Sequence, residues 1–415
     1  MIALPALADQ VINAAADPAC LYGPIQQEIL NDEAFARALA AVSSWPGYAP
    51  TPLVELAGLA RQAGLARLAY KDEGARFGLG SFKALGGAYA VWQVLRRSAQ
   101  AAGIAPDDAD RMRLHAAGLT VCCATDGNHG RSVAWGARTF GSACVIFIHE
   151  TVSEGRKAAI EAFGAQVVRT PGTYDDSVRE AQRRASEEGW VVVSDTSYPG
   201  YRDIPKDVMQ GYEIMAHEAL AQWEARWGAD SPPTHVFLQT GVGGMAAAVA
   251  AHLWRRFGAA RPVIVLADPD RAACWVESLR AGHPVPVHGA LDTLMAGLAC
   301  GEVSELAWEI LCTAADGAVA VCDEAAVALM RLLAEGVDGD PALVAGESAV
   351  AGLAACLTIS PLLSGASATA FGLTPQSRVL VFGTEGATDA ELYHQIVGAP
   401  VPHQPAVSQN PEPLP

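Results

Sequence analysis

The 415-residue sequence is poor in positive charge and lacks any residue pattern typical of a protein-built metal site. It has 28 lysines and arginines against 45 aspartates and glutamates, so its formal net charge is −17. Nucleic acids and anionic membrane surfaces would repel such a chain, and neither is expected as a partner. The ten histidines and nine cysteines show no HExxH or zinc-ligand spacing, so we expect no metal site.

The sequence also lacks C-x-x-C pairs, long apolar runs and a basic leader. Free thiols in a reducing compartment are the expected state of the cysteines, although a bridge between Cys274 and Cys300 is left open. No apolar run is long enough to cross a bilayer. The opening residues, MIALPALADQV, do not resemble a secretory signal. These features predict a cytoplasmic protein.

Between its ends the chain alternates short apolar runs with longer amphipathic stretches. Hydrophobic residues make up 51% of it and charged residues 18%, enough to build a large core. The alternation indicates βαβ units, an α/β fold with open, mostly parallel twisted sheets. Strands are expected at 120–124, 143–148, 166–169, 190–193, 235–238, 262–266 and 378–382, and helices at 82–97, 131–140, 154–163, 174–188 and 245–256.

The expected strands fall into two groups, and the WGADSPPTH segment near residues 220–234 has the composition of a linker. We expect a discontinuous large domain (1–90 and 226–398), a small α/β domain (91–225) and a disordered tail (399–415). Ligands of open parallel sheets bind beyond the carboxyl ends of the strands. The active site is therefore expected in a cleft between the domains.

A first candidate site is the loop RFGLGSFKALGG, which brings Phe82 and Lys83 to the start of a helix. The positive end of the helix dipole lowers the pKa of an amine, which suits a nucleophile that later acts as a base. A solvated helix lysine is the alternative. The Lys71-Asp-Glu73 run before this loop is interpreted as a solvated strand end.

Two further loops each join an expected strand to an expected helix. In Thr240-Gly-Val-Gly-Gly-Met245, successive backbone N–H groups at a helix start can bind a phosphate. Its spacing is neither that of a dinucleotide fingerprint nor that of a P-loop. In Thr125-Asp-Gly-Asn-His129, the turn can hold an anion and Asn128 can bind an oxygen of a flat ligand. A simple turn is the alternative in both cases.

The order and spacing of the three loops, after Pro50-Thr-Pro-Leu53, resemble the fold-type II enzymes that depend on pyridoxal phosphate (PLP). Threonine dehydratases, cysteine synthase and tryptophan synthase β belong to this class. The resemblance implies that Lys83 holds the cofactor as a Schiff base. The other cofactor contacts that it implies are Phe82, Asn128, Gly241, Val242, Gly243, Gly244, Met245 and Thr384, with Glu385 as the rival of Thr384 at the ring nitrogen.

Two carboxylates point to one family within this class. Dehydratases usually carry Ser-Ala-Gly-Asn-His where this chain has Asp126 inside Thr-Asp-Gly-Asn-His, and Asp195 is a second unusual acid. With RFGLGSFKALGGAYA and WPGYAPTPL, they resemble the diaminopropionate ammonia-lyases over residues 22–397. Gly80-Ser81 departs from the Asn-Ala expected in several relatives. A negatively charged pocket complements the second amino group of 2,3-diaminopropionate.

That resemblance implies an α,β-elimination that gives pyruvate and two ammonia, in a homodimer. Lys83 and Asp126 would serve as bases on opposite faces of the substrate and so accept both isomers. Asp195 would hold or protonate the β-amino group, and Thr125 would contribute to substrate binding. The alternatives are a serine or threonine dehydratase, a racemase or β-replacement enzyme, a catalytically silent amino-acid-binding protein and, from the glycine loop alone, a nucleotide-dependent oxidoreductase.

Overall fold

The computed structural model describes residues 4–125, 127–363 and 370–401, and the chain packs as two compact units. Unit 1 is formed by the described residues of 1–31, 50–75 and 215–403. Unit 2 is formed by residues 32–49 and by those described within 76–214. The long helix α9 (Asp203–Trp227) carries the chain from the second unit into the first.

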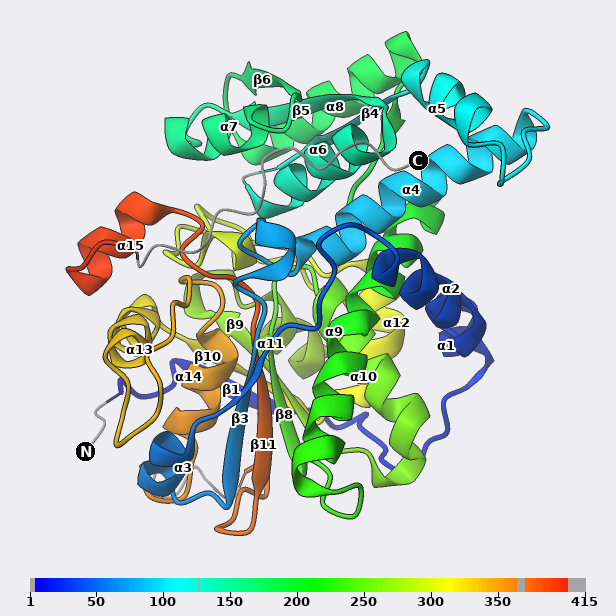
Figure 1. The fold of residues 1–415 in the computed structure, drawn as a ribbon. Coiled ribbons are helices and arrows are strands. Elements are labelled where there is room, and N and C mark those ends of the chain that lie inside the picture. Colours follow the sequence, from blue (N-terminus) through cyan, green and yellow to red (C-terminus); the bar gives the residue numbers. More distant parts are fainter. Residues whose placement is uncertain (1–3, 126, 364–369, 402–415) are drawn as a thin grey trace. The chain divides into compact units, whose positions relative to one another are not determined.

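Unit 1 is built on a seven-stranded mixed sheet with the order β1-β10-β9-β8-β11-β3-β2. The five inner strands are parallel to one another, and each of the two edge strands is antiparallel to the strand beside it. Figure 1 shows β3 and β11 side by side in this sheet. The strands are β1 (Asp9–Ile12), β2 (Leu53–Glu55), β3 (Arg67–Asp72), β8 (His235–Gln239), β9 (Val263–Pro269), β10 (Gly317–Val321) and β11 (Arg378–Gly383).

Helices surround this sheet and bury the apolar side chains of its inner strands. The AGLAACL run of α14 is buried throughout and belongs to one apolar core with β8, β10 and β11. Inner strands with no exposed residue, such as HVFLQ, are typical of a sheet covered on both faces. The helices of unit 1 are α1 (Pro24–Ile29), α3 (Ala57–Ala63), α10 (Gly244–Phe257), α11 (Cys274–Ala281), α12 (Glu305–Ala314), α13 (Asp323–Glu335), α14 (Ala351–Thr358) and α15 (Ala390–Val397).

Unit 2 has a four-stranded, fully parallel sheet with the order β6-β5-β4-β7. Its helices α4 and α6 pack closely because small residues face each other. A methyl group on Gly136 would lie 2.8 Å from Ala88 Cα. The elements are β4 (Thr120–Ala124), β5 (Ala143–His149), β6 (Gln166–Thr170), β7 (Val191–Val192), α2 (Asp32–Ser43), α4 (Lys83–Ala101), α5 (Ala109–Ala117), α6 (Asn128–Phe140), α7 (Glu154–Glu161) and α8 (Tyr174–Glu188).

The expected α/β class with mostly parallel sheets is confirmed. The packing units differ from the expected domain limits, because residues 32–49 and 76–90 pack with unit 2 and the division near residue 214 falls inside α9. The segment 228–234 after α9 is a turn within unit 1. Of the expected disordered tail, residues 402–415 lie outside the described residues.

The interpretation of Lys71 and Glu73 as a solvated strand end was wrong. Both side chains are fully buried in unit 1. Lys71 Nζ lies 2.8 Å from a carboxylate oxygen of Glu218 and donates to the carbonyl of Thr51, whose hydroxyl donates to Glu73. Burial of these two side chains is tolerated because each has a polar or charged partner. The sequence did not reveal this burial because none of the partners is near in sequence.

Candidate active site

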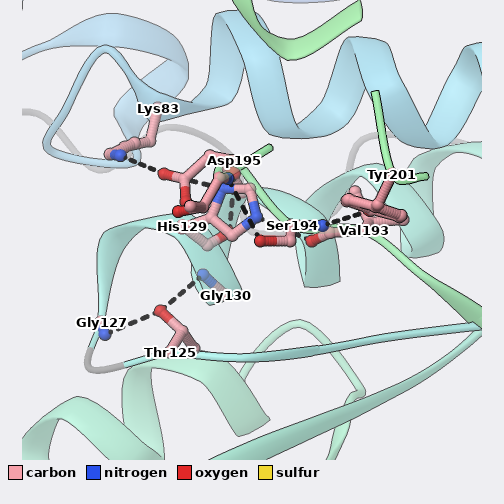
Figure 2. A network of polar contacts seen from close by, with 11 residues as sticks. Lys83, Thr125, Gly127, His129, Gly130, Val193, Ser194, Asp195 and Tyr201 are labelled. Carbon is pink, nitrogen blue, oxygen red and sulfur yellow. Dashed lines mark hydrogen bonds and ion pairs between the residues drawn. The ribbon is translucent and has the colours of Figure 1, made fainter. Parts of the chain in front are cut away.

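Lys83 is the first residue of α4, and its amine is paired with a carboxylate (Figure 2). Lys83 Nζ lies 2.5 Å from Asp195 Oδ2, and the two side chains are 21% and 19% exposed. Asp195 follows β7, whose end is held by Tyr201: the Tyr201 hydroxyl donates to Val192 O and accepts from Ser194 N. The two residues are 112 positions apart in sequence, so the fold of unit 2 brings them together.

The charge state of Asp195 depends on its two basic neighbours. Burial raises the pKa of its carboxyl, but the Lys83 ammonium and the His129 ring outweigh burial and hold that pKa well below its ordinary value. The carboxyl is therefore a carboxylate at neutral pH. A buried carboxylate of this kind requires a cation, and Lys83 supplies it in the structure.

His129 is a buried neighbour of this pair, 7% exposed. Its Nε2 hydrogen-bonds Val193 O at 2.8 Å, while Nδ1 lies 3.8 Å from Asp195 and has no hydrogen-bond partner among the described residues. Burial lowers the pKa of the ring. His129 was not predicted as a site residue from the sequence.

The loop between β4 and α6 is organised by Thr125. Its buried hydroxyl accepts from Gly127 N at 3.1 Å and from Gly130 N at 3.2 Å (Figure 2). Asp126, the expected second base, lies outside the described residues. Asn128 is the first residue of α6 and is half-buried. The hydroxyl of Thr125 thus shapes the loop, and its contact with substrate stays a prediction.

Two aromatic rings flank the lysine. The Phe82 and Tyr212 ring centroids are 4.6 Å apart, and Lys83 Nζ lies 5.4 and 5.7 Å from them. The Gly86 position allows this approach, since a methyl group there would lie 2.4 Å from the Tyr212 ring. Tyr212 was not identified from the sequence, because it belongs to α9 and only its packing against α4 reveals it.

The predicted phosphate loop of unit 1 has the expected form. It follows β8, and Gly244 and Met245 open α10. Gly243 has a φ of +97°, which favours glycine, and a methyl group there would lie 2.1 Å from the Trp275 ring. A methyl group on Gly241 would lie 3.0 Å from Cys300 Sγ. Close packing against Trp275 and Cys300 therefore requires glycine at these two positions, and binding of a phosphate by the N–H groups of the loop stays a prediction.

Thr384 follows β11 and is buried. Its hydroxyl oxygen accepts a hydrogen bond from Gln239 Nε2 at 2.8 Å, and Gln239 also donates to Phe382 O. This arrangement leaves the Thr384 O–H group able to donate. The rival Glu385 accepts from Ser348 N at 3.1 Å. Gln239 was missed in the sequence, where it is merely the last residue of a strand.

These residues fit the cofactor expected from the sequence. PLP requires an amine for covalent attachment, N–H donors for its phosphate and a partner for its ring nitrogen. Unit 2 contains such an amine in Lys83, and unit 1 contains a glycine loop at a helix start and the hydroxyl of Thr384; their contacts with the cofactor stay a prediction. Among the described residues, no cluster of three or more His, Cys, Asp or Glu side chains could bind a metal ion.

A lysine at a helix start and a glycine loop at a second helix start, on two parallel-stranded units, are the features of a PLP enzyme. The chain belongs to the family of pyridoxal-phosphate dependent enzymes, whose sequence profile matches residues 44–374. Its fold is that of fold type II.

Within this family the expected resemblance is confirmed. The chain is 38% identical over 354 residues to diaminopropionate ammonia-lyase of Escherichia coli (strain K12), covering 85% of this chain and 88% of that protein. It is 35% identical over 382 residues to the Salmonella typhimurium (strain LT2) enzyme, covering 89% and 93%. The crystal structure of holo diaminopropionate ammonia lyase from Escherichia coli matches with a TM-score of 0.83 and 34% identity, covering 95% and 98%.

In the part of the chain that the structure describes, no helix combines the length and apolar character of a membrane span. All nine cysteines are free thiols, including Cys274 and Cys300.

Proposed function

We propose that this protein is a diaminopropionate ammonia-lyase, a PLP-dependent carbon–nitrogen lyase. It would convert 2,3-diaminopropionate to pyruvate and two molecules of ammonia by α,β-elimination. The similarity to enzymes of that name over most of the chain supports the proposal. The observation that carries it is the carboxylate of Asp195 against the amine of Lys83.

The Lys83–Asp195 pair explains the preference for a diamine. Asp195 is a mostly buried carboxylate whose lowered pKa depends on nearby positive charge. When Lys83 is bound to the cofactor, or is the neutral amine that accepts a proton, a second cation of the same chemistry satisfies the carboxylate. The β-ammonium group of 2,3-diaminopropionate is such a cation, whereas the hydroxyl of serine or threonine is neutral. The discrimination therefore follows from the charge that Asp195 requires.

Different residues of the chain have different roles in the elimination. When bound, PLP acts as an electron sink that acidifies the Cα proton of the substrate. Lys83 Nζ accepts that proton, and Asp195 holds the β-nitrogen as an ammonium group until it leaves as ammonia. The released three-carbon enamine hydrolyses to pyruvate and a second ammonia. Tyr212 and Phe82 flank the amine that moves the proton.

Several assignments remain proposals about particular residues and assembly. Asp126 is proposed as the base for the opposite isomer, and Thr125 as a contact of the substrate. Asn128 is proposed to bind the ring hydroxyl, and Thr384 the ring nitrogen. A homodimer and a cytoplasmic location are likewise proposed.

The test is a substrate panel with the purified, PLP-loaded enzyme. L- and D-2,3-diaminopropionate, L-serine and L-threonine are supplied separately, and pyruvate or the corresponding oxo acid is measured. We expect diaminopropionate to give the highest kcat/KM, by at least about tenfold over serine, the size of one charge-assisted contact. The variant Asp195→Asn should lose this preference by weakening turnover of diaminopropionate more than that of serine. Turnover confined to serine or threonine would instead establish a dehydratase.

A further inference from the structure

We propose that Asp268 and Trp275 are positioning residues for the cofactor phosphate, which fix the glycine loop so that its N–H groups face the phosphate. The inference deepens the proposed function and rests on its cofactor assignment, but not on the identity of the substrate. Both residues lie in unit 1, as does the loop. Neither residue was identified from the sequence, and neither belongs to the loop itself.

The argument starts from the carbonyl groups of the loop. Trp275 Nε1 donates to Gly241 O at 3.0 Å, and Cys274 Sγ lies 3.7 Å from the same oxygen. The next carbonyl, that of Val242, accepts from Ser304 N at 2.9 Å. Two successive carbonyl oxygens of the loop are therefore held by α11 and by the residue before α12.

Because the peptide unit is planar, the contacts of these carbonyl groups also determine where the N–H groups of the loop point. In a trans peptide, C=O and N–H point in opposite directions across one plane. The carbonyl of Gly241 belongs to the same plane as the N–H of Val242, and the carbonyl of Val242 to that of Gly243. Each carbonyl oxygen that is held therefore fixes the direction of the N–H group in the same peptide plane, away from the donor that holds the oxygen. These two donors join the N–H groups that open α10 and favour an anion there.

Asp268, at the end of β9, holds Trp275 in place. Its Oδ2 accepts from Trp275 N at 2.8 Å and from Val276 N at 3.0 Å, and its Oδ1 accepts from the hydroxyl of Thr240. The residue before α11 is Ala273, which has no side chain able to cap the helix. Asp268 therefore caps α11 from a neighbouring strand and at the same time holds the residue that precedes the glycine loop.

The burial of Asp268 supports a dedicated role. The side chain is fully buried, and burial raises its pKa to about 7, against the effect of its three donors. A carboxyl group whose charged form is costly to bury is accommodated here because it joins β9, α11 and Thr240 at one point. The Trp275 ring completes this support by lying against the backbone of Gly243.

The experiment compares two ligands that differ only in the phosphate. Apoprotein is titrated with PLP and with pyridoxal, and the absorbance change on attachment at Lys83 gives a dissociation constant for each. The variants are Asp268→Ala, Asp268→Asn and Trp275→Phe. The control is Asn13→Ala, which removes two buried hydrogen bonds to Cys312 O and Ala315 O in the same unit, away from the loop.

A positioning role predicts a loss that is specific to the phosphate. Asp268→Ala should weaken PLP binding by about tenfold or more and pyridoxal binding by less than about twofold, since three hydrogen bonds to a buried carboxyl group are removed. Trp275→Phe should show a smaller loss, about threefold to tenfold. Asp268→Asn should bind PLP more tightly than Asp268→Ala, because its amide can replace part of the contacts. Asn13→Ala should leave the ratio of the two constants unchanged.

A merely structural role would give a different pattern. Equal losses for PLP and pyridoxal, or unchanged PLP affinity in Trp275→Phe, would overturn the inference. If Asp268→Ala does not fold, Trp275→Phe and Asp268→Asn still decide. The variants could show the expected losses of PLP affinity relative to pyridoxal while the wild-type protein does not turn over diaminopropionate. That result would refute the proposed function and leave this inference standing.

Discussion

The variant Asp195→Asn tests the electrostatics of the Lys83 cluster in the apoprotein, before any catalytic question is asked. Removing one partner of a fully buried ion pair costs roughly 3–5 kcal/mol, whereas exposed pairs contribute roughly 0–1 kcal/mol. Here the two side chains are 21% and 19% exposed, and asparagine keeps one oxygen that can accept from Lys83. We therefore expect the free energy of unfolding at pH 7 to fall by about 1–2 kcal/mol, which urea titration measures.

The contribution of Asp195 to the free energy of unfolding depends on pH in a direction that follows from its pKa. The folded-state pKa of Asp195 lies below its ordinary value of 3.8. Its contribution is therefore present above about pH 4 and is lost only as the pH falls further toward the folded-state pKa. The difference between wild type and Asp195→Asn should stay constant between about pH 8 and about pH 5 and shrink only in more acidic solution.

Asp207→Asn is the matched control in unit 2. Asp207 is paired with Arg97 at 2.6 Å, and burial raises its pKa to about 6. A raised carboxyl pKa stabilises the fold at low pH, and this contribution is lost as the pH rises through about 6. Between about pH 5 and about pH 8, the free energy of unfolding of wild type should therefore fall relative to that of Asp207→Asn as the pH rises. Over the same pH range, the difference between wild type and Asp195→Asn should stay constant. A difference for Asp195→Asn below about 0.3 kcal/mol, or one that changes between pH 8 and pH 5, would refute the reasoning.

Three further predictions concern the cofactor groups. Lys83→Ala should abolish covalent attachment of PLP, which mass spectrometry after borohydride reduction detects; a modified variant would show that another amine holds the cofactor. Gly243→Ala should weaken PLP binding by at least about tenfold in an absorbance titration, because its φ of +97° and the Trp275 ring leave no place for a methyl group. Gln239→Leu should lower kcat by about tenfold with little change in KM, since it releases the hydroxyl of Thr384; an unchanged kcat would argue against Thr384 as the partner of the ring nitrogen.

The loops were predictable because their signals are local. A buried strand, a glycine-rich turn and a helix follow one another directly at β8 and α10, and likewise at β4 and α6. Adjacent residues show both the periodicity of each strand and helix and the glycines that the turn between them requires. The start of α4 at Lys83 is visible for the same reason.

The contacts that the sequence did not reveal join distant segments. Lys71 meets a carboxylate 147 residues away, and Asp195 meets Lys83 across 112 residues. β1, β2 and β10 were also missed, because β1 and β2 are only four and three residues long and GAVAV of β10 is rich in small residues with weak strand preference. Burial of Lys71 depends on tertiary partners that no local pattern reports.

The central claim is most directly tested by the ratio of ammonia to pyruvate formed from 2,3-diaminopropionate by the PLP-loaded enzyme. Elimination of the β-amino group followed by hydrolysis of the enamine predicts two ammonia for each pyruvate, and one for each pyruvate from serine if it is turned over at all. A wild-type enzyme that binds PLP yet releases no pyruvate from either isomer of diaminopropionate would contradict the account.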